Sequence, residues 1–317
     1  MPDDFSGTVD DILQNEHLLT QAQLEAIERE IKSSQPLTSH LLPISVLAQQ
    51  YKADDTSNIN DDEQCGFARA ASFLCGKYAS LRKVRGDGNC FYRAFLYAMC
   101  ERLLSRRLDH RNDDDDDDAE FRRVKRTVVD SLKWICRQGY DEYTIDMFHE
   151  ELVDLFDFIE RASSETSSKE GIDDDHTKAV PSENVMQQLH SKLNEEHAAS
   201  DYCTWFMRLM VAGQMKSNPD RYLPYILVEN YNDVHSFCSR EVEPMGKECG
   251  MVQVSALAEC FGVRVVIEYM DGRMGLGGER LAHHVFGGEV DDDSDVNKEE
   301  RTSITLLYRP GHYDILY

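Results

Sequence analysis

A cysteine stands where a glycine-rich turn runs into a helical pattern. Gly86 and Gly88 tolerate backbone angles that a side chain resists, while Asp87 and Asn89 favour turns and helix caps. A thiol at a helix N-terminus feels the positive end of the helix dipole. Its pKa can fall there from about 8.5 into the ~3.5–7.5 range. The pattern therefore makes Cys90 a candidate nucleophile; the competing interpretation is a small buried structural cysteine.

The same turn is suited to holding an oxyanion. The first backbone N–H groups of a helix have no intrahelical partner and can bind negative charge. A tetrahedral oxyanion is stabilised by donors of this kind. Gly88, Asn89 and Cys90 supply the residues of this turn and helix start. Nucleophile and oxyanion hole are thus expected to come from one short stretch.

A partner for this thiol lies at the other end of the chain. His312 follows the turn residues Pro310 and Gly311 at the start of a predicted strand, and Asp314 is two residues further on. Alternation along a strand puts His312 and Asp314 on one face, so the carboxylate can hold one ring nitrogen while the other faces a nucleophile. This is the arrangement of a Cys-His-Asp triad. A surface histidine in a turn is the alternative, and the joint occurrence with Cys90 favours the triad.

Other clusters give weaker signals. His283 and His284 lack spaced ligand partners, and His235 with Cys238 forms only a pair. The glycines at 275–278 follow a hairpin turn, and neither a helix nor a lysine comes next, so they make a poor phosphate loop. No metal or cofactor is expected.

Composition narrows the function classes. The chain has 317 residues and a net charge of −25, with acidic runs at 113–118, 173–175 and 291–295. Nucleic-acid binding, which needs a basic face, is not expected. The nine cysteines form no C-x-x-C pair, and neither a signal-peptide core nor a membrane-spanning stretch is evident. We therefore expect a protein of the reducing cytoplasm, with the nucleus as a second compartment, that does not bind membranes and acts as a monomer.

The periodicity changes along the chain. Helical patterns are predicted for most of the chain up to residue 262, including a capping box at 20–23 ahead of Leu24, Ile27 and Ile31. Strand patterns follow at 263–270, 303–308 and 313–317, with a glycine-rich, acidic connection between the first two. Helices first and strands last indicate the α+β class, with the helical part packed on a C-terminal antiparallel sheet.

The two candidate catalytic segments resemble those of a known family. The segment 87–95 reads DGNCFYRAF, and 306–317 reads LLYRPGHYDILY. Both resemble the otubains, which are ovarian-tumour-type (OTU) cysteine proteases with a papain-like fold that cleave ubiquitin chains. EVEPM at 241–245, VIEYMD at 266–271 and EREI at 28–31 are also similar to that family. The resemblance extends from about residue 21 to the C-terminus, and Gly86 stands where the family commonly has proline.

The resemblance implies roles and partners. Cys90 would be the nucleophile, His312 the general base and Asp314 its orienter, with Asp87 in the turn that shapes the oxyanion hole. The implied reaction is hydrolysis of the isopeptide bond of polyubiquitin, with preference for lysine-48-type chains. Otubain-like proteins can also restrain ubiquitin-conjugating enzymes without cleavage, which leaves a non-catalytic, ubiquitin-binding function as the alternative. A redox-sensing thiol protein is a third possibility, but it gives His312 no role.

Domain organisation and a ubiquitin-facing surface complete the expectations. Residues 1–40 are predicted to form an N-terminal arm with a short helix. Residues 41–317 form an OTU-type catalytic domain with acidic insertions near 109–118, 163–181 and 287–300. The candidate ubiquitin-binding residues are Tyr202, Phe206, Tyr222, Tyr225 and Met245, for which burial in the core is the competing interpretation.

Overall fold

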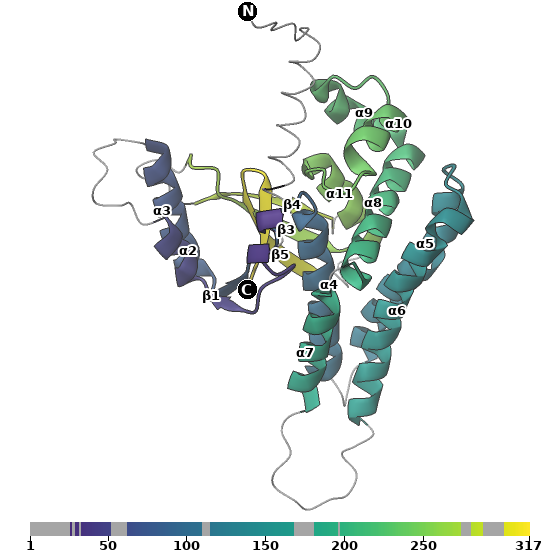
Figure 1. The fold of residues 1–317 in the computed structure, drawn as a ribbon, viewed down its shortest axis with the longest axis horizontal. Coiled ribbons are helices and arrows are strands. Elements are labelled where there is room, and N and C mark those ends of the chain that lie inside the picture. The colour runs from purple at the N-terminus through teal and green to yellow at the C-terminus, as the bar shows by residue number, and fades with distance from the viewer. Residues whose placement is uncertain are drawn as a thin grey trace, which may run out of the picture.

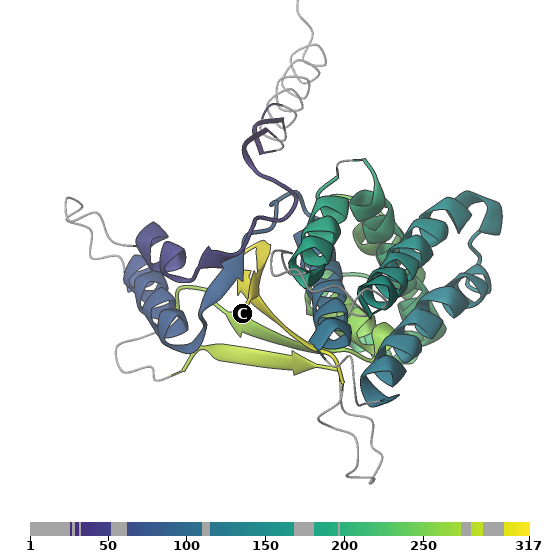
Figure 2. The ribbon, with the colours of Figure 1, turned by 90° about the horizontal axis from the view of Figure 1, so that it is seen from below.

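A mixed sheet separates a small helical pair from a larger helical group (Figures 1 and 2). The computed structural model describes residues 26, 29–31, 33–51, 62–109, 115–167, 181–195, 197–273, 280–287 and 301–317. Its strands are β1 (Leu42–Pro43), β2 (Ser80–Arg82), β3 (Arg264–Tyr269), β4 (Ala282–Phe286), β5 (Ser303–Arg309) and β6 (His312–Leu316), in the spatial order β1-β2-β6-β5-β3-β4.

The helices fall on the two sides of this sheet. The small pair consists of α2 (Ser45–Gln50) and α3 (Asp62–Lys77). The larger group comprises α4 (Cys90–Asp109), α5 (Asp115–Cys136), α6 (Glu142–Ser167), α7 (Pro181–Leu193), α8 (Ala199–Ser217), α9 (Pro219–Ile226), α10 (Val234–Phe237) and α11 (Met251–Phe261). A 3₁₀ turn, η1 (Leu227–Glu229), follows α9, and a π-helical turn, η2 (Cys238–Val242), follows α10.

The hydrophobic core explains this arrangement. Helix α4 is buried on most of its surface through its first three turns, as expected of a helix that other elements surround. Tyr313 and Ile315 of β6 join the core around α4, and the rings of Phe91 and Tyr313 lie 5.3 Å apart. Leu307 and Leu316 face the second core, beneath α2 and α3. The last two strands thus run between two cores, and the larger core fixes the start of α4 against the C-terminal strand.

The α+β class is confirmed, but the sheet is not wholly antiparallel. Strands β3 and β5 pair in parallel, with Val265 opposite Ile304. The reason is β4, which lies inside the glycine-rich segment that the sequence presented as a connection. The chain reverses into β4 at the sheet edge and must reverse again, so β5 runs in the direction of β3. The N-terminal strands β1 and β2 also join this sheet.

Several predicted helices and loops can be compared directly. Pro219 occupies the first turn of α9 after Asn218, and Gly262 ends α11 in the left-handed conformation, as expected. The segment 109–118 is only partly a loop, because α5 already begins at Asp115. Leu24 and Ile27 of the predicted arm helix, and residues 168–180 and 288–300 of the predicted insertions, lie outside the described residues.

Candidate active site

The turn before α4 is fixed at both of its ends. The backbone N–H of Val84 donates to Asp314 Oδ1 at 2.9 Å, which ties the entrance of the turn to β6. Gly88 has a φ of +74°, and a Cβ built there would lie 2.0 Å from the carbonyl oxygen of Gly246. Only glycine combines this backbone angle with so close an approach. The turn is therefore packed backbone to backbone against the segment that follows η2.

Cys90 is the first residue of α4, as the sequence predicts, and its side chain is buried. The backbone N–H of Arg93 donates to the carbonyl of Asn89 at 3.1 Å, which closes the first helical turn. The amides of Cys90, Phe91 and Tyr92 therefore precede the intrahelical ladder and belong to the unpaired donors of a helix start. The thiol and these donors share the positive end of the α4 dipole.

His312 is paired with Asp314 and interacts with the Cys90 thiol. Its Nε2 donates to Asp314 Oδ1 at 2.9 Å, which leaves Nδ1 outside that bond. Burial would lower the pKa of His312, but hydrogen bonds and charge interactions with Asp314 and Cys90 raise it to about 9. The ring is therefore an imidazolium at neutral pH. This charge state suits a cysteine nucleophile paired with a histidine.

Asp314 has a second cationic partner that the sequence reasoning missed. Arg309 forms a short ion pair with Asp314 Oδ2, and it stands opposite His312 in the β5–β6 hairpin register. Burial would raise the pKa of Asp314, but the hydrogen bond from His312 and the charge of Arg309 hold it below its ordinary value. The carboxylate is fully buried and remains ionised. Arg309, three residues before His312 across a Pro-Gly turn, was available as a signal.

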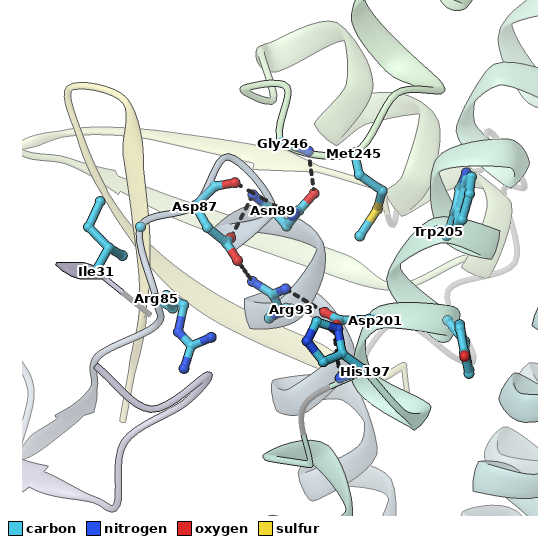
Figure 3. A pocket seen from close by; sticks show the side chains of 12 residues that line it. Ile31, Arg85, Asp87, Asn89, Arg93, His197, Asp201, Trp205, Met245 and Gly246 are labelled. Atoms are coloured by element: carbon cyan, nitrogen blue, oxygen red, sulfur yellow. Dashed lines mark hydrogen bonds and ion pairs between the residues drawn. The ribbon is translucent and has the colours of Figure 1, made fainter. Parts of the chain in front are cut away.

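Asp87 is bound within its own turn and does not reach across to His312. Its Oδ1 accepts from the Asn89 backbone N–H at 3.0 Å, and its Oδ2 pairs with Arg93. Arg93 also donates to Asp201 of α8 at 2.6 Å. The Asp87 carboxylate therefore shapes the turn, and Arg93 connects that turn to α8 (Figure 3).

A cavity of about 610 Å³ opens beside this turn. One wall is formed by Asp87, Asn89 and Arg93, and the opposite wall carries the aromatic side chains of α8 (Figure 3). The complete lining consists of Ile31, Arg85, Gly86, Asp87, Asn89, Arg93, His197, Asp201, Tyr202, Trp205, Met245 and Gly246. The cavity thus adjoins the residues that precede Cys90 and has both apolar and charged walls.

The five candidate ubiquitin-binding residues do not share one surface. Phe206 and Tyr222 are buried in the main core, so the expectation that they face ubiquitin is wrong. On an apolar helix such as α8, the aromatic residues that point inward cannot be told from those that point outward by composition. Tyr225 is 62% exposed, whereas Tyr202 and Met245 line the cavity beside the turn.

Arg208 is the other functional candidate that the sequence reasoning missed. It lies in α8 between Met207 and Leu209, and its side chain is fully buried. A single arginine within a strongly apolar helix was the available signal, because a buried charge needs a specific set of partners. Its guanidinium contacts the turn before Cys90.

Neither weak metal candidate gains a third ligand among the described residues. His283 and His284 lie on the edge strand β4, while Cys238 is buried with its thiol directed to the Ala212 carbonyl. Within the described ranges, His, Cys, Asp and Glu side chains form no group of three that could hold a metal ion. No helix in these ranges is long and apolar enough to cross a membrane.

A family model and several known proteins match this chain over most of its length. The family model described as Peptidase C65 Otubain matches residues 30–317. Ubiquitin thioesterase OTUB1 of Homo sapiens is 33% identical over 296 residues, which cover 93% of this chain and 88% of that protein. A protein of Caenorhabditis elegans described as ubiquitin thioesterase otubain-like is 30% identical over 310 residues, which cover 96% and 89%.

Solved structures show the same similarity. A complex described as ceOTUB1, ubiquitin aldehyde and UBC13~Ub has a TM-score of 0.69 at 29% identity, covering 93% of this chain and 98% of that one. A second, described as h/ceOTUB1, ubiquitin aldehyde and UBCH5B~Ub, has a TM-score of 0.70 at 28% identity, covering 96% and 98%.

Proposed function

The chain belongs to the peptidase C65 otubain family, and we propose that it is a deubiquitinating cysteine protease with Cys90 as its nucleophile. The observation that carries the proposal is the double engagement of His312. One ring nitrogen is bound to the buried Asp314 carboxylate, and the ring also interacts with Cys90 at the start of α4. A nucleophile, a proton carrier and an orienting group then stand in sequence.

Acylation begins with the Cys90 thiolate. Its sulfur attacks the carbonyl carbon of the isopeptide bond after the C-terminal glycine of ubiquitin, and the carbonyl oxygen becomes an oxyanion. The Cys90 backbone N–H at the helix start donates to this oxygen. When the intermediate collapses, the carbon–nitrogen bond breaks and His312 donates its proton to the departing lysine amine. A thioester between Cys90 and ubiquitin remains.

Deacylation reverses the proton movement. His312 is neutral after acylation and accepts a proton from water as the water oxygen attacks the thioester carbon. The carbon–sulfur bond breaks, ubiquitin leaves with a free carboxylate, and the thiolate–imidazolium pair is restored. Asp314 stabilises the charged ring in both steps and holds the tautomer that presents Nδ1 to the sulfur.

The substrate class is polyubiquitin, and we propose a preference for lysine-48-type chains. The family resemblance of the two catalytic segments supports this preference. The test is a panel of diubiquitins, one for each linkage, incubated with the full chain and followed by gel. Cleavage of the lysine-48-linked dimer well ahead of the others is expected. Equal cleavage of all linkages would contradict the preference, and cleavage of none would contradict the activity.

A second function is favoured by the solved relatives, whose complexes contain a ubiquitin-conjugating enzyme carrying ubiquitin. We propose that this chain also restrains such enzymes, without needing its chemistry to do so. Cys90→Ser should retain inhibition of ubiquitin chain synthesis in a reconstituted reaction while losing diubiquitin cleavage. Loss of both effects in a folded variant would tie the inhibition to catalysis and remove the second function.

A further inference from the structure

The fully buried guanidinium of Arg208 binds an unusual set of acceptors. Its Nε and Nη2 donate to Asn89 Oδ1 at 3.2 and 2.8 Å. Nη2 also donates to the carbonyls of Gly88 and Lys247 at 2.8 and 2.6 Å, and Nη1 donates to the carbonyl of Val242 at 3.0 Å. Among the residues described, no carboxylate accepts a hydrogen bond from this cation.

These acceptors lie on two segments that face each other. Gly88 and Asn89 form the turn before Cys90, while the segment 242–247 begins at the last residue of η2 and continues beyond it. The backbone N–H of Gly246 reinforces the connection by donating to Asn89 Oδ1 at 3.0 Å. Together with the close approach of Gly88 to Gly246, these bonds join the turn and the facing segment into one rigid wall of the site.

The bonds also determine which way the turn peptides point. The Gly88 carbonyl is directed at Arg208, and the Asn89 N–H on the opposite side of that peptide is held by Asp87. The Asn89 carbonyl accepts from Arg93. The peptide plane that carries the Cys90 N–H is therefore set by Asn89, whose side chain is bound by Arg208.

A position of this kind is costly for a protein to maintain. A buried cation without a carboxylate is less favourable than an apolar side chain of the same size, which α8 would otherwise accommodate. The guanidinium is stacked on the ring of Tyr92, whose centroid is 4.5 Å away, and its planar fork suits several acceptors at once. Lysine presents a single point charge and cannot reproduce that fork.

We infer that Arg208 is a positioning residue for the oxyanion hole, acting through Gly88 and Asn89 to aim the backbone N–H of Cys90. The inference rests on the proposed function, since it assigns Arg208 to the acyl-transfer step of the same site. Arg208 does not touch the reacting atoms, and it leaves the thiol and the His312 pair to other groups.

The test compares two reactions of Cys90 in the full chain. Ubiquitin aldehyde forms a reversible tetrahedral adduct whose oxygen needs the oxyanion donors, whereas alkylation by iodoacetamide needs only the thiolate. For Arg208→Lys and Asn89→Ala, the affinity gain of ubiquitin aldehyde over unmodified ubiquitin should fall about 10–100-fold, with a similar loss of kcat. The KM should stay within about threefold of wild type, and so should the rate of Cys90 alkylation, measured by mass spectrometry. The alkaline limb of the pH profile should move by less than about 0.3 pH units.

Arg123→Lys is the matched control. Arg123 also donates to backbone carbonyls, those of Phe261 and Gly262, but it caps α11 instead of contacting the turn before Cys90. This variant should lose thermal stability without losing the aldehyde affinity gain. If it lost that gain as well, general loosening of the helical group would explain the effect and the inference would fail.

Three further outcomes would overturn the inference. One is an unchanged affinity gain of ubiquitin aldehyde over unmodified ubiquitin in folded Arg208→Lys and Asn89→Ala. If Arg208→Lys does not fold, the result for Asn89→Ala decides. Another is a parallel fall in alkylation rate, which would place the effect on the thiol. The third is a shift of the alkaline limb, which would place it on His312. Failure of the proposed function is separate, because the wild-type chain would then neither cleave diubiquitin nor form the aldehyde adduct.

Discussion

Two arginines near the candidate nucleophile, Arg208 fully buried and Arg309 partly buried, have opposite electrostatic settings. Arg309 is paired with a carboxylate, Asp314, which is also the partner of His312. Among the described residues, the hydrogen bonds of Arg208 go to neutral oxygens, those of three carbonyls and the Asn89 amide. Arg309, Asp314 and His312 form a connected series of charged groups. Arg208 instead binds neutral dipoles, which include the backbone of the turn before Cys90.

The difference separates two requirements of acyl transfer. On the His312 side, charges decide whether the ring carries a proton, so changes there should move the pH dependence. On the Arg208 side, neutral acceptors decide where a donor points, so changes there should lower turnover at every pH alike. Arg208→Lys keeps the positive charge and Asn89→Ala removes a neutral group, so neither change should shift the pKa of His312 appreciably. The pH profile therefore distinguishes the two sides experimentally.

The largest effect is expected at the residue on which both sides act. Cys90→Ala should abolish cleavage of diubiquitin, because neither the charges nor the dipoles have a nucleophile to serve. The buried site accepts the smaller side chain, so the fold and the affinity for ubiquitin should persist. The measurements are gel-based cleavage and titration with unmodified ubiquitin. Substantial residual cleavage would show that Cys90 is not the nucleophile. The roles assigned to the Arg309 and Arg208 sides would then no longer apply.

Asp314→Asn should break the charged side alone. The amide cannot stabilise the imidazolium, so we expect kcat to fall roughly 10–10³-fold, or about 1.4–4 kcal/mol of barrier. In the wild-type chain the active imidazolium is lost as the pH rises through about 9, the pKa of His312. Without the carboxylate this pKa falls, so the alkaline limb of kcat/KM should move to lower pH.

Stability should respond in the same variant. Arg309 loses its carboxylate in a buried setting, which should cost about 1–3 kcal/mol in the free energy of unfolding. In the wild-type chain, the depressed pKa of Asp314 adds stability above the unfolded value near 3.9, and this contribution is lost as the pH falls through the native pKa. An unmoved alkaline limb in Asp314→Asn would show that another group sets the charge of His312.

One substitution made at both arginines sharpens the comparison. Arg309→Lys keeps a cation beside Asp314, so turnover should stay within about threefold of wild type, under 1 kcal/mol of barrier. The same change at Arg208 removes a fork that serves several acceptors and should cost more. Steady-state kinetics of the two variants, with circular dichroism to verify folding, make the measurement. A larger loss at Arg309 than at Arg208 would reverse the assignment of charge and geometry.

The sequence supports the chemistry of the site better than its scaffold. Cys90, His312 and Asp314 stood out because their neighbours form turns whose geometry is local; in the structure His312 binds Asp314 and interacts with Cys90. Arg309 meets Asp314, five positions away, only because the β5–β6 hairpin forms, whereas Arg208 acts across a long sequence separation. Nothing local tells that Arg208 will meet Asn89, 119 positions away.

The fold shows the same limit. The apolar stretch 200–215 and the helix predicted at 252–261 carry local signals, and the structure has helices at 199–217 and 251–261. Strand β4 was missed because it is an edge strand with mostly exposed side chains, including two histidines, and so lacks alternation. Strands β1 and β2, of two and three residues, are defined by their sheet neighbours and leave no signal of their own.

The smallest effect is expected at Gly86. Gly86 adjoins His312 and Gly88 adjoins the segment bound by Arg208, so the two glycines allow the same comparison at the backbone. A Cβ at Gly86 would lie 3.4 Å from His312 Nδ1, the near edge of ordinary van der Waals contact, so the ring can keep its place. Gly86 is not among the residues with positive φ, so alanine also removes unfolded-state freedom. Gly86→Ala should therefore lower kcat by no more than about twofold while raising stability by about 0.4–1 kcal/mol.

Gly88→Ala is the matched variant for the other side. Its positive φ and the 2.0 Å approach to the Gly246 carbonyl make alanine strained at that position. This variant should lose both stability and turnover, since the wall between the turn and the 242–247 segment must open. Thermal melts and diubiquitin kinetics of the two variants test the contrast. If Gly88→Ala were the milder change, the turn would tolerate movement. The hydrogen bonds of Arg208 would then not be needed to position it.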